Sequence, residues 1–273
     1  MKTIRTKNAM VRYSDLARKK GTTIAFVPTM GALHDGHLTL IRKAKATGAH
    51  VVVSIYVNPT QFGPSEDFNK YPRQLVKDAA LARKAGADIL FAPASMYDNN
   101  DEFSVDPGNM ATLLCGKRRP GHFKGVATVV LKFFNIVKPH FAYFGQKDAQ
   151  QVVIISKMVK ELDLNVKIIP VATVREKDGL AMSSRNNRLS ANDRLKAVSL
   201  YKALSSVRTS FEGGNTNPSI AIKKGTKELL GRLEYLTAVN PETLLPVKRL
   251  HKGVLVAGAM HLGDTRLIDN IFL

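Results

Sequence analysis

Residues 22–57, TTIAFVPTMGALHDGHLTLIRKAKATGAHVVVSIYV, carry the clearest succession of strand-like and helix-like patterns in the chain. The first part of this stretch, Thr22–Pro28, is a short apolar run that ends in a turn. Leu38–Gly48 then places apolar side chains at helical spacing. Val51–Val57 is rich in β-branched residues, which is typical of a strand buried on both faces. The stretch therefore predicts a strand, a helix and a second strand in succession.

The same alternation continues along the next hundred residues. It predicts strands at Asp88–Ala92, Phe141–Phe144 and Val166–Val174, and helices at Gln74–Ala85, Val126–Val137 and Asp148–Leu162. Alternating strands and helices favour a parallel sheet with helices on both faces and right-handed connections. The fold class predicted for this part of the chain is therefore α/β, with a doubly wound parallel sheet.

The pattern changes near Val174. Long helical patterns follow at Ala191–Phe211 and Ser219–Tyr235, and apolar strands follow at Val254–Met260 and Arg266–Phe272. This mixture predicts a second, smaller domain of the α+β class. We expect one domain over residues 1–173 and the other over residues 174–273.

Composition excludes several classes of protein. The chain has 273 residues, and 44% of them are hydrophobic, so disorder of the whole chain is excluded. A single cysteine, Cys115, excludes an internal disulfide framework and a thiolate metal cluster. No apolar run approaches the ~18 residues of a membrane span, and the first residues lack a secretory signal. We therefore expect a cytoplasmic protein with no membrane partner.

The charge balance is strongly basic. Lys and Arg total 41 against 22 Asp and Glu, a formal net charge of +19. Such an excess attracts polyanions, so a nucleic-acid-binding module is one alternative interpretation. However, the basic residues are spread along the chain, and no zinc-finger spacing or aromatic RNA-binding signature accompanies them. Solvated surface charge is the favoured interpretation, no specific nucleic-acid partner is expected, and a small anionic substrate is compatible with either view.

The strongest local motif is PTMGALHDGH, residues 28–37, which follows a predicted strand and opens a helix. Gly31 and Gly36 allow tight turns and close approach of the backbone. His34 and His37 are three residues apart, so they share one face at the start of the helix. A helix N-terminus attracts anions through its unpaired N–H groups. The motif therefore predicts a polyphosphate site. A zinc site is not expected, because no third ligand accompanies the two histidines.

Two further motifs carry donors suited to phosphate. AMSSRN, residues 181–186, places the hydroxyls of Ser183 and Ser184 beside the guanidinium of Arg185. FGQKDAQQ, residues 144–151, lies where a predicted strand ends and a helix begins, and it carries Lys147. Ligands of open parallel sheets bind outside the carboxyl ends of the strands, so Lys147 is expected to face the phosphates.

A long loop, YVNPTQFGPSEDFNKYPR, spans residues 56–73 and follows the most buried predicted strand. Asn58 and Gln61 supply neutral donors and acceptors, while Phe62 and Tyr71 supply apolar walls. This mixture suits a small polyhydroxylated acid. The equally weighted alternative interpretation is a proline-containing loop with a purely structural role.

Taken together, the motifs closely resemble one enzyme family. PTMGALHDGH, VNPTQFGPSEDFNKYPR, RPGHFKGVATVV (119–130), FGQKDAQQ, VREKDGLAMSSRN and TRLIDNI (265–271) look like the pantothenate synthetase family, the pantoate–β-alanine ligases. This family is part of the HIGH-type nucleotidyltransferase superfamily. The resemblance covers nearly the whole chain, in order, and it implies a Rossmann-like first domain, a smaller C-terminal domain and a homodimer.

The resemblance implies an AMP-forming ligase that condenses (R)-pantoate with β-alanine to give pantothenate. ATP would be a substrate, Mg²⁺ would be required, and a pantoyl adenylate would form with release of pyrophosphate. By the same resemblance, the catalytic residues would be His37, His34, Lys147 and Arg185. Contacts to ATP would come from Met30, Gly31, His34, His37, Gly145, Gln146, Lys147, Asp148, Val174, Met182, Ser183, Ser184 and Arg185. Gln61 and Gln151 would bind pantoate and β-alanine, and Asp78 is a candidate ligand of Mg²⁺.

One rival enzyme class keeps the same phosphate motifs. A nucleotidyltransferase that transfers a nucleotidyl group to a phosphorylated alcohol would need the two histidines, but it would not need Gln61 and Gln151. The products separate the two classes, because AMP is released only if an acceptor consumes the adenylate.

Overall fold

The computed structural model describes residues 1–64, 66–98 and 100–273. Ser65, which belongs to the loop over residues 56–73, and Asn99 lie outside the described residues. The chain divides into two compact units. The first unit comprises Met1–Thr112, Gly116–Gly145 and Ile154–Val171. The second unit comprises Leu113–Cys115, Gln146–Val153 and Ala172–Leu273.

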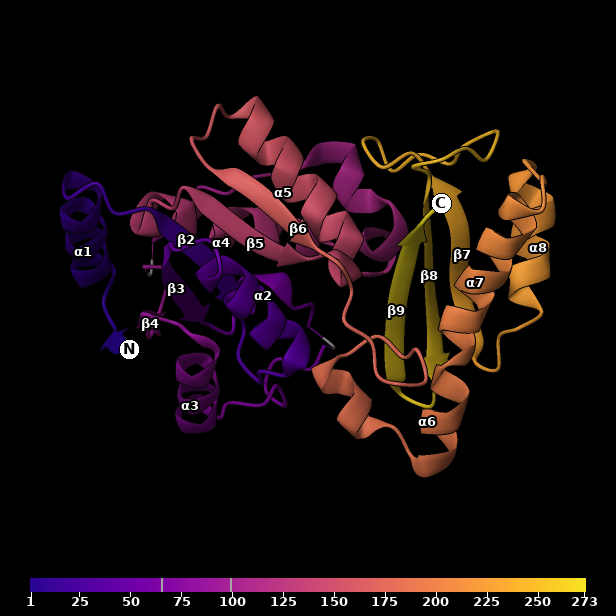
Figure 1. Cartoon of the computed structure of the whole chain (residues 1–273), viewed down its shortest axis with the longest axis horizontal. Helices are drawn as coiled ribbons and strands as arrows, with labels where there is room; N and C mark the ends of the chain where they lie inside the picture. Colours follow the sequence, from indigo (N-terminus) through magenta and orange to yellow (C-terminus); the bar gives the residue numbers. More distant parts are fainter. Residues whose placement is uncertain (65, 99) are drawn as a thin grey trace. The chain divides into compact units, whose positions relative to one another are not determined.

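Within its described residues, the first unit contains a six-stranded sheet in the order β1-β4-β3-β2-β5-β6 (Figure 1). Every neighbouring pair of strands in it is parallel. The strands are β1 (Lys2–Ile4), β2 (Ile24–Thr29), β3 (His50–Ile55), β4 (Ile89–Phe91), β5 (Phe141–Gly145) and β6 (Lys167–Val171). The α/β fold class is confirmed, and the Rossmann-like parallel sheet with it.

Helices cover both faces of this sheet. They are α1 (Lys7–Lys19), α2 (Asp35–Lys45), α3 (Leu75–Ala85), α4 (His122–Val137) and α5 (Ala149–Glu161). Alternate residues of β2 show the two faces: Ala25 and Val27 belong to the core beneath α2, whereas the ring of Phe26 packs on Phe133 of α4, with 5.4 Å between ring centroids. Successive side chains of a strand point to opposite faces, so β2 is buried from both sides.

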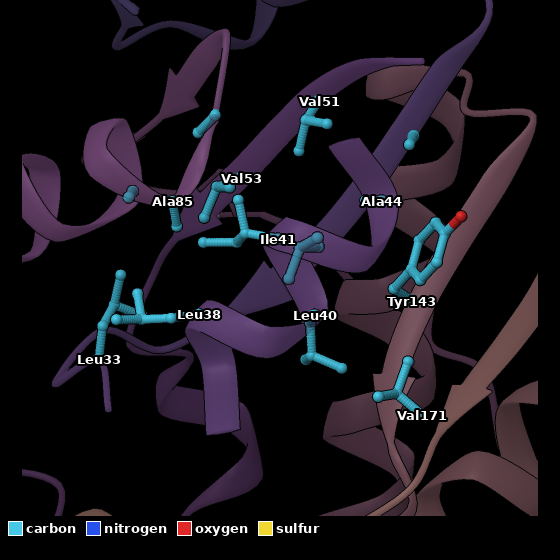
Figure 2. Packing of buried hydrophobic residues seen from close by; sticks show 14 of the residues in the cluster. Leu33, Leu38, Leu40, Ile41, Ala44, Val51, Val53, Ala85, Tyr143 and Val171 are labelled. Carbon is cyan, nitrogen blue, oxygen red and sulfur yellow. The ribbon is translucent and has the colours of Figure 1, made fainter. Parts of the chain in front are cut away.

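Figure 2 shows how α2 is fixed on the sheet. Leu40, Ile41 and Ala44 of this helix lie over Val51 and Val53 of β3 in one buried cluster. The spacing of the three helical residues is the 3–4 residue repeat of an amphipathic helix. Because the helix is held along its length, its first turn has a defined position at the carboxyl end of β2.

The second unit contains, among the described residues, a three-stranded antiparallel sheet in the order β7-β8-β9. Its strands are β7 (Arg232–Val239), β8 (Leu255–Leu262) and β9 (Thr265–Phe272). Its helices are α6 (Ala191–Ala197), α7 (Ser199–Glu212) and α8 (Pro218–Thr226), and two short 3₁₀ turns are η4 (Gln146–Asp148) and η5 (Ser184–Arg188). This is the smaller α+β arrangement that the sequence predicts.

Two helix predictions in the second unit need correction. The pattern at Ala191–Phe211 forms two helices, α6 and α7, separated at Val198. The helix predicted over Ser219–Tyr235 is wrong beyond Thr226, because residues 232–239 form β7. The spacing of Leu229, Leu233 and Leu236 imitates a helical face, but pairing with β8 overrides it.

A glycine marks the point where this strand begins. A Cβ atom at Gly231 would lie 2.7 Å from the carbonyl oxygen of His261, so only glycine lets the chain approach β8 this closely.

Among the described residues, no helix is both long enough and apolar enough to cross a bilayer.

Candidate active site

The loop after β2 turns tightly before it enters α2. The hydroxyl of Thr29 donates to the carbonyl of Ser54 at 2.7 Å and accepts from the N–H of Gly31 at 3.2 Å. Gly31 has φ +87°, and a Cβ there would lie 2.9 Å from Oδ2 of Asp78 and 3.2 Å from Cγ2 of Ile55. Position 31 therefore requires glycine for both its conformation and its space.

The carboxylate of Asp78 fixes the backbone of this loop. The side chain projects from α3 and is 1% exposed. Its Oδ2 accepts from the N–H of Ala32 and its Oδ1 accepts from the N–H of Leu33, each at 2.9 Å. Both oxygens thus serve the backbone that leads to His34. That Asp78 binds Mg²⁺ stays a prediction. In the structure its carboxylate fixes the backbone of the loop through two hydrogen bonds.

His34 and His37 cap the first turn of α2 reciprocally. His34 is the N-cap residue, and its Nδ1 accepts from the N–H of Gly36 at 3.2 Å. Nδ1 of His37 accepts from the N–H of His34 at 3.3 Å, and the two ring centroids are 4.1 Å apart. Because both Nδ1 atoms accept, the proton of each neutral ring lies on Nε2. Both rings thus lie at a helix N-terminus, where the dipole favours an anion.

Gln61 lies beside Met30 in the same unit. It is 7% exposed, in the 3₁₀ turn η1 (Pro59–Gln61), and its Nε2 donates to Sδ of Met30 at 2.8 Å. Nδ2 of Asn58 donates to Oε1 of Gln61 at 3.2 Å and to the carbonyl of Gly125 at 3.1 Å. A Cβ at Gly125 would lie 2.3 Å from the carbonyl oxygen of Thr60. Glycine on α4 therefore lets the helix approach this turn closely enough for Asn58 to fix the amide of Gln61.

Arg119 and His122 complete this region, although neither is among the residues predicted for the site. Arg119 Nε and Nη2 donate to the two carboxylate oxygens of Glu66 at 2.7 and 2.6 Å, and Nη1 donates to Nε2 of His122 at 2.8 Å. Since a guanidinium can only donate, Nδ1 of His122 carries the proton and donates to the carbonyl of Gln61 at 2.8 Å. A chain of hydrogen bonds thus runs from Glu66 to the main chain of Gln61.

The ion pair of Glu66 with Arg119 gives a pH-dependent prediction. Burial alone raises the pKa of Glu66, but the hydrogen bonds and charge of Arg119 outweigh it and leave the pKa below its usual value. Such a group stabilises the fold above its unfolded pKa, about 4.3, and this contribution is lost as the pH falls through the folded pKa. We expect Glu66→Gln to lower the free energy of unfolding by about 1–2 kcal/mol at pH 7.

Urea denaturation between pH 7 and pH 3 measures this effect. The difference between wild type and Glu66→Gln should shrink from about pH 4.3 downward. Glu161→Gln is the matched control, because Glu161 forms an exposed pair with Lys157 on α5. A difference that stays constant across this range contradicts the prediction.

The second unit holds the motif that contains Lys147. Gln146, Lys147 and Asp148 form the turn η4, and Gln151 lies in the first turn of α5. Nδ2 of Asn270 donates to the carbonyls of Gln146 and Lys147, each at 2.9 Å. The neighbouring Gln150 is buried: its Oε1 accepts from the N–H of Cys115 at 3.0 Å and its Nε2 donates to the carbonyl of Leu113 at 2.7 Å. The start of α5 is therefore fixed within the second unit.

The serine–arginine motif of the second unit follows a short hairpin. The N–H of Met182 donates to the carbonyl of Val174 at 3.0 Å, and Arg175 pairs with Ala181 in an antiparallel bridge. Ser183 is the N-cap of η5, and its Oγ accepts from the N–H of Arg185 at 3.3 Å. The hairpin thus gives Ser183–Arg185 a defined starting point.

The structure therefore separates the predicted site residues into two groups, each described within its own unit. The first unit contains Met30, Gly31, His34, His37, Gln61, Asp78 and Gly145, the last residue of β5. The second unit contains Gln146, Lys147, Asp148, Gln151, Val174, Met182, Ser183, Ser184 and Arg185. Among the described residues, no group of three or more His, Cys, Asp or Glu side chains is arranged to hold a metal ion.

Comparison with known proteins identifies the family of the chain. The family model described as pantoate-beta-alanine ligase matches residues 2–272. A curated pantothenate synthetase of Caldicellulosiruptor saccharolyticus is 49% identical over 93% of this chain and 92% of its own. A pantothenate synthetase of Fervidobacterium nodosum is 47% identical over 100% of this chain and 99% of its own.

Solved structures show the same likeness. Pantothenate synthetase from Thermus thermophilus has a TM-score of 0.91 and 42% identity, covering 99% of both chains. Pantoate-beta-alanine ligase from Francisella tularensis, solved with beta-gamma ATP and beta-alanine, has a TM-score of 0.81 and 35% identity, covering 100% of this chain and 97% of its own. The family model spans nearly the whole chain, and the curated relatives and solved structures agree with it. The chain therefore belongs to the pantoate–β-alanine ligase family of enzymes.

Proposed function

We propose that the chain joins (R)-pantoate to β-alanine through a pantoyl adenylate, consuming ATP and releasing AMP and pyrophosphate. The observation that carries this proposal is the reciprocal capping at the N-terminus of α2, in which Nδ1 of His34 and of His37 each accept from a backbone N–H. A helix N-terminus of this kind suits a polyphosphate. The Francisella tularensis relative, solved with an ATP compound and beta-alanine, supports ATP and β-alanine as ligands here as well.

The first step requires two anions to meet. An oxygen of the pantoate carboxylate attacks the α-phosphorus of ATP, the bond to the β-phosphate oxygen breaks, and pyrophosphate leaves. A carboxylate is already a nucleophile at neutral pH, so the reaction depends on alignment and positive charge rather than on a base. We assign His34 and His37 the role of donors to phosphate oxygens. Cations and hydroxyl donors are assigned to Lys147, Ser183, Ser184 and Arg185.

In the second step the free amine of β-alanine attacks the acyl carbon of the mixed anhydride. The bond from this carbon to the phosphate oxygen breaks, AMP leaves with the electron pair, and the ammonium formed loses a proton to solvent. Because AMP is a good leaving group, positioning again dominates. The neutral amides of Gln61 and Gln151 orient hydroxyl and carboxylate groups without adding charge.

Mg²⁺ and a homodimer remain predictions from the family. The only proposed protein ligand of Mg²⁺, Asp78, already accepts from two backbone N–H groups. Among the described residues, no three or more His, Cys, Asp or Glu side chains form a group that could hold a metal ion, so a site made of protein ligands alone is not supported. Mg²⁺ commonly binds through one or two carboxylates together with substrate phosphates, so its requirement is tested with ATP present.

Isotope exchange tests the order of the two steps. If the carboxylate is activated first, labelled pyrophosphate should enter ATP in the presence of pantoate and Mg²⁺ and without β-alanine. Adding β-alanine should then yield pantothenate and AMP in equal amounts. Exchange without pantoate, or exchange that appears only with β-alanine, contradicts the adenylate scheme.

Gln61 provides a prediction about substrate binding. We expect Gln61→Ala to raise the KM for pantoate about tenfold or more and to leave the KM for ATP nearly unchanged, because one or two hydrogen bonds to the acid are lost. Steady-state rates at varied pantoate and at varied ATP measure the two constants. Asn135→Ala, which removes an exposed amide from α4, is the control. A larger effect on ATP than on pantoate is the result that removes Gln61 from the pantoate site.

A further inference from the structure

Two neighbouring residues of β9 contact the turn that carries Lys147 and the start of the hairpin that leads into Ser183. Asp269 and Asn270 are each 4% exposed. Nδ2 of Asn270 donates to the carbonyl oxygens of Gln146 and Lys147, both at 2.9 Å. Since both neighbours are acceptors, they fix the orientation of the amide. Asn270 thereby holds the main chain of the turn that carries Lys147.

The side chain of Asp269 holds the other segment. Nη1 and Nη2 of Arg175 donate to its two oxygens at 2.5 and 3.0 Å, a bidentate arrangement. Arg175 also donates to the carbonyls of Gly179 and Asn270, at 3.1 and 3.3 Å. Its guanidinium lies 3.9 Å from the ring centroid of Tyr201. Arg175 stands at the base of the hairpin that leads into Ser183, so Asp269 fixes the origin of that loop.

The two holding residues are themselves tied together. The N–H of Asn270 donates to Oδ1 of Asp269 at 2.8 Å, and the two residues are consecutive on a strand that pairs with β8 along its length. The Oδ1 atom of Asn270 is buried and has no hydrogen-bond partner among the described residues. Leaving a buried amide oxygen without a hydrogen bond costs free energy. We therefore attribute the position of this side chain to the two hydrogen bonds that its N–H groups donate.

We propose that Asp269 and Asn270 are positioning residues for the reaction, which set the placement of Lys147 relative to the Ser183–Arg185 loop. This inference rests on the proposed function, in which both segments bind phosphate. The transfer of a phosphorus centre depends on alignment, and a displacement of about 1 Å can cost about 10²-fold in rate. Asn270 acts through Lys147 and touches no substrate.

A double-mutant cycle tests this coupling. We expect Asn270→Ala to lower kcat/KM for ATP by about 10- to 100-fold in the otherwise native chain. In a Lys147→Ala background the same change should have almost no further effect, because the group that it positions is gone. Asn240→Ala is the matched control: Asn240 also makes two side-chain bonds to the main chain, to the N–H groups of Glu242 and Thr243, in the same unit. It should leave the rate unchanged.

Hydrogen exchange of the whole chain gives a second readout that does not depend on activity. Asn270→Ala, and the near-isosteric Asn270→Asp, should speed amide exchange across residues 146–150, whereas Asn240→Ala should not. Equal effects of Asn270→Ala with and without Lys147, or native exchange in both Asn270 variants, overturn the inference. A wild-type chain without turnover refutes the proposed function instead, and the exchange data then still decide whether Asn270 holds the turn.

Discussion

Replacing His37 by alanine is expected to lower the kcat for pantothenate formation about 10²–10³-fold, the usual loss when a preorganised donor to developing charge is removed. The ring stands at the third position of α2, and its Nδ1 is engaged by the N–H of His34. Nε2 is therefore the donor that the reaction loses. Pyrophosphate exchange with saturating ATP and pantoate measures the step directly.

The same ring also caps the helix, so two further variants separate the roles. His37→Asn keeps an acceptor near the position of Nδ1 but has no group at the position of Nε2, and it should restore the stability without restoring the rate. His37→Gln returns an N–H near Nε2 and should recover part of the rate. Thr39→Val, which removes an exposed hydroxyl from the same helix, is the control. Near-native turnover in both His37→Ala and His37→Asn would refute the phosphate site at α2.

The second large effect is expected at Lys147. Lys147→Ala should lower the rate of adenylate formation by about 10²–10³-fold, because a cation that offsets the charge of the phosphates is lost. Lys147→Arg should restore little of it, since a planar guanidinium does not reproduce the compact charge of an ammonium. Single-turnover measurements of the two half-reactions locate the defect.

When pantoyl adenylate is supplied, Lys147→Ala should react with β-alanine at nearly the native rate. Lys202→Ala, an exposed lysine on α7, gives the same change of net charge and should have no effect. A larger defect in the amine step than in adenylate formation shows that Lys147 serves the acceptor rather than the phosphates.

The strands and helices of the first unit could be predicted because their patterns are local. Val51–Val57 is β-branched and apolar, and the structure places β3 at His50–Ile55. The three-residue strand β1 has no comparable pattern, since it exists only by pairing with β4. The same limit explains the error after Thr226, where leucines at helical spacing belong to a strand whose partner, β8, lies further along the chain.

The site shows the same division between local and distant information. The two histidines could be proposed from their spacing at a helix start. The contacts of Asp78 with Ala32 and Leu33 join residues 46 and 45 positions apart, and the bond from His122 to Gln61 joins residues 61 positions apart. A motif shows which chemical groups are present. The spacing of its residues does not predict which distant carbonyl or amide each group will hydrogen-bond.

The contact between Asn270 and the turn of Lys147 also has a consequence for biosynthesis. The ribosome adds Asn270 123 residues after Lys147. The parallel sheet of the first unit is complete in sequence at Val171, well before β9 is translated. A nascent chain can therefore form its first unit, together with the histidine pair, while the turn of Lys147 still lacks the side chain that holds it. Competence for the proposed adenylate step should accordingly arise late, when β9 emerges and pairs with β8.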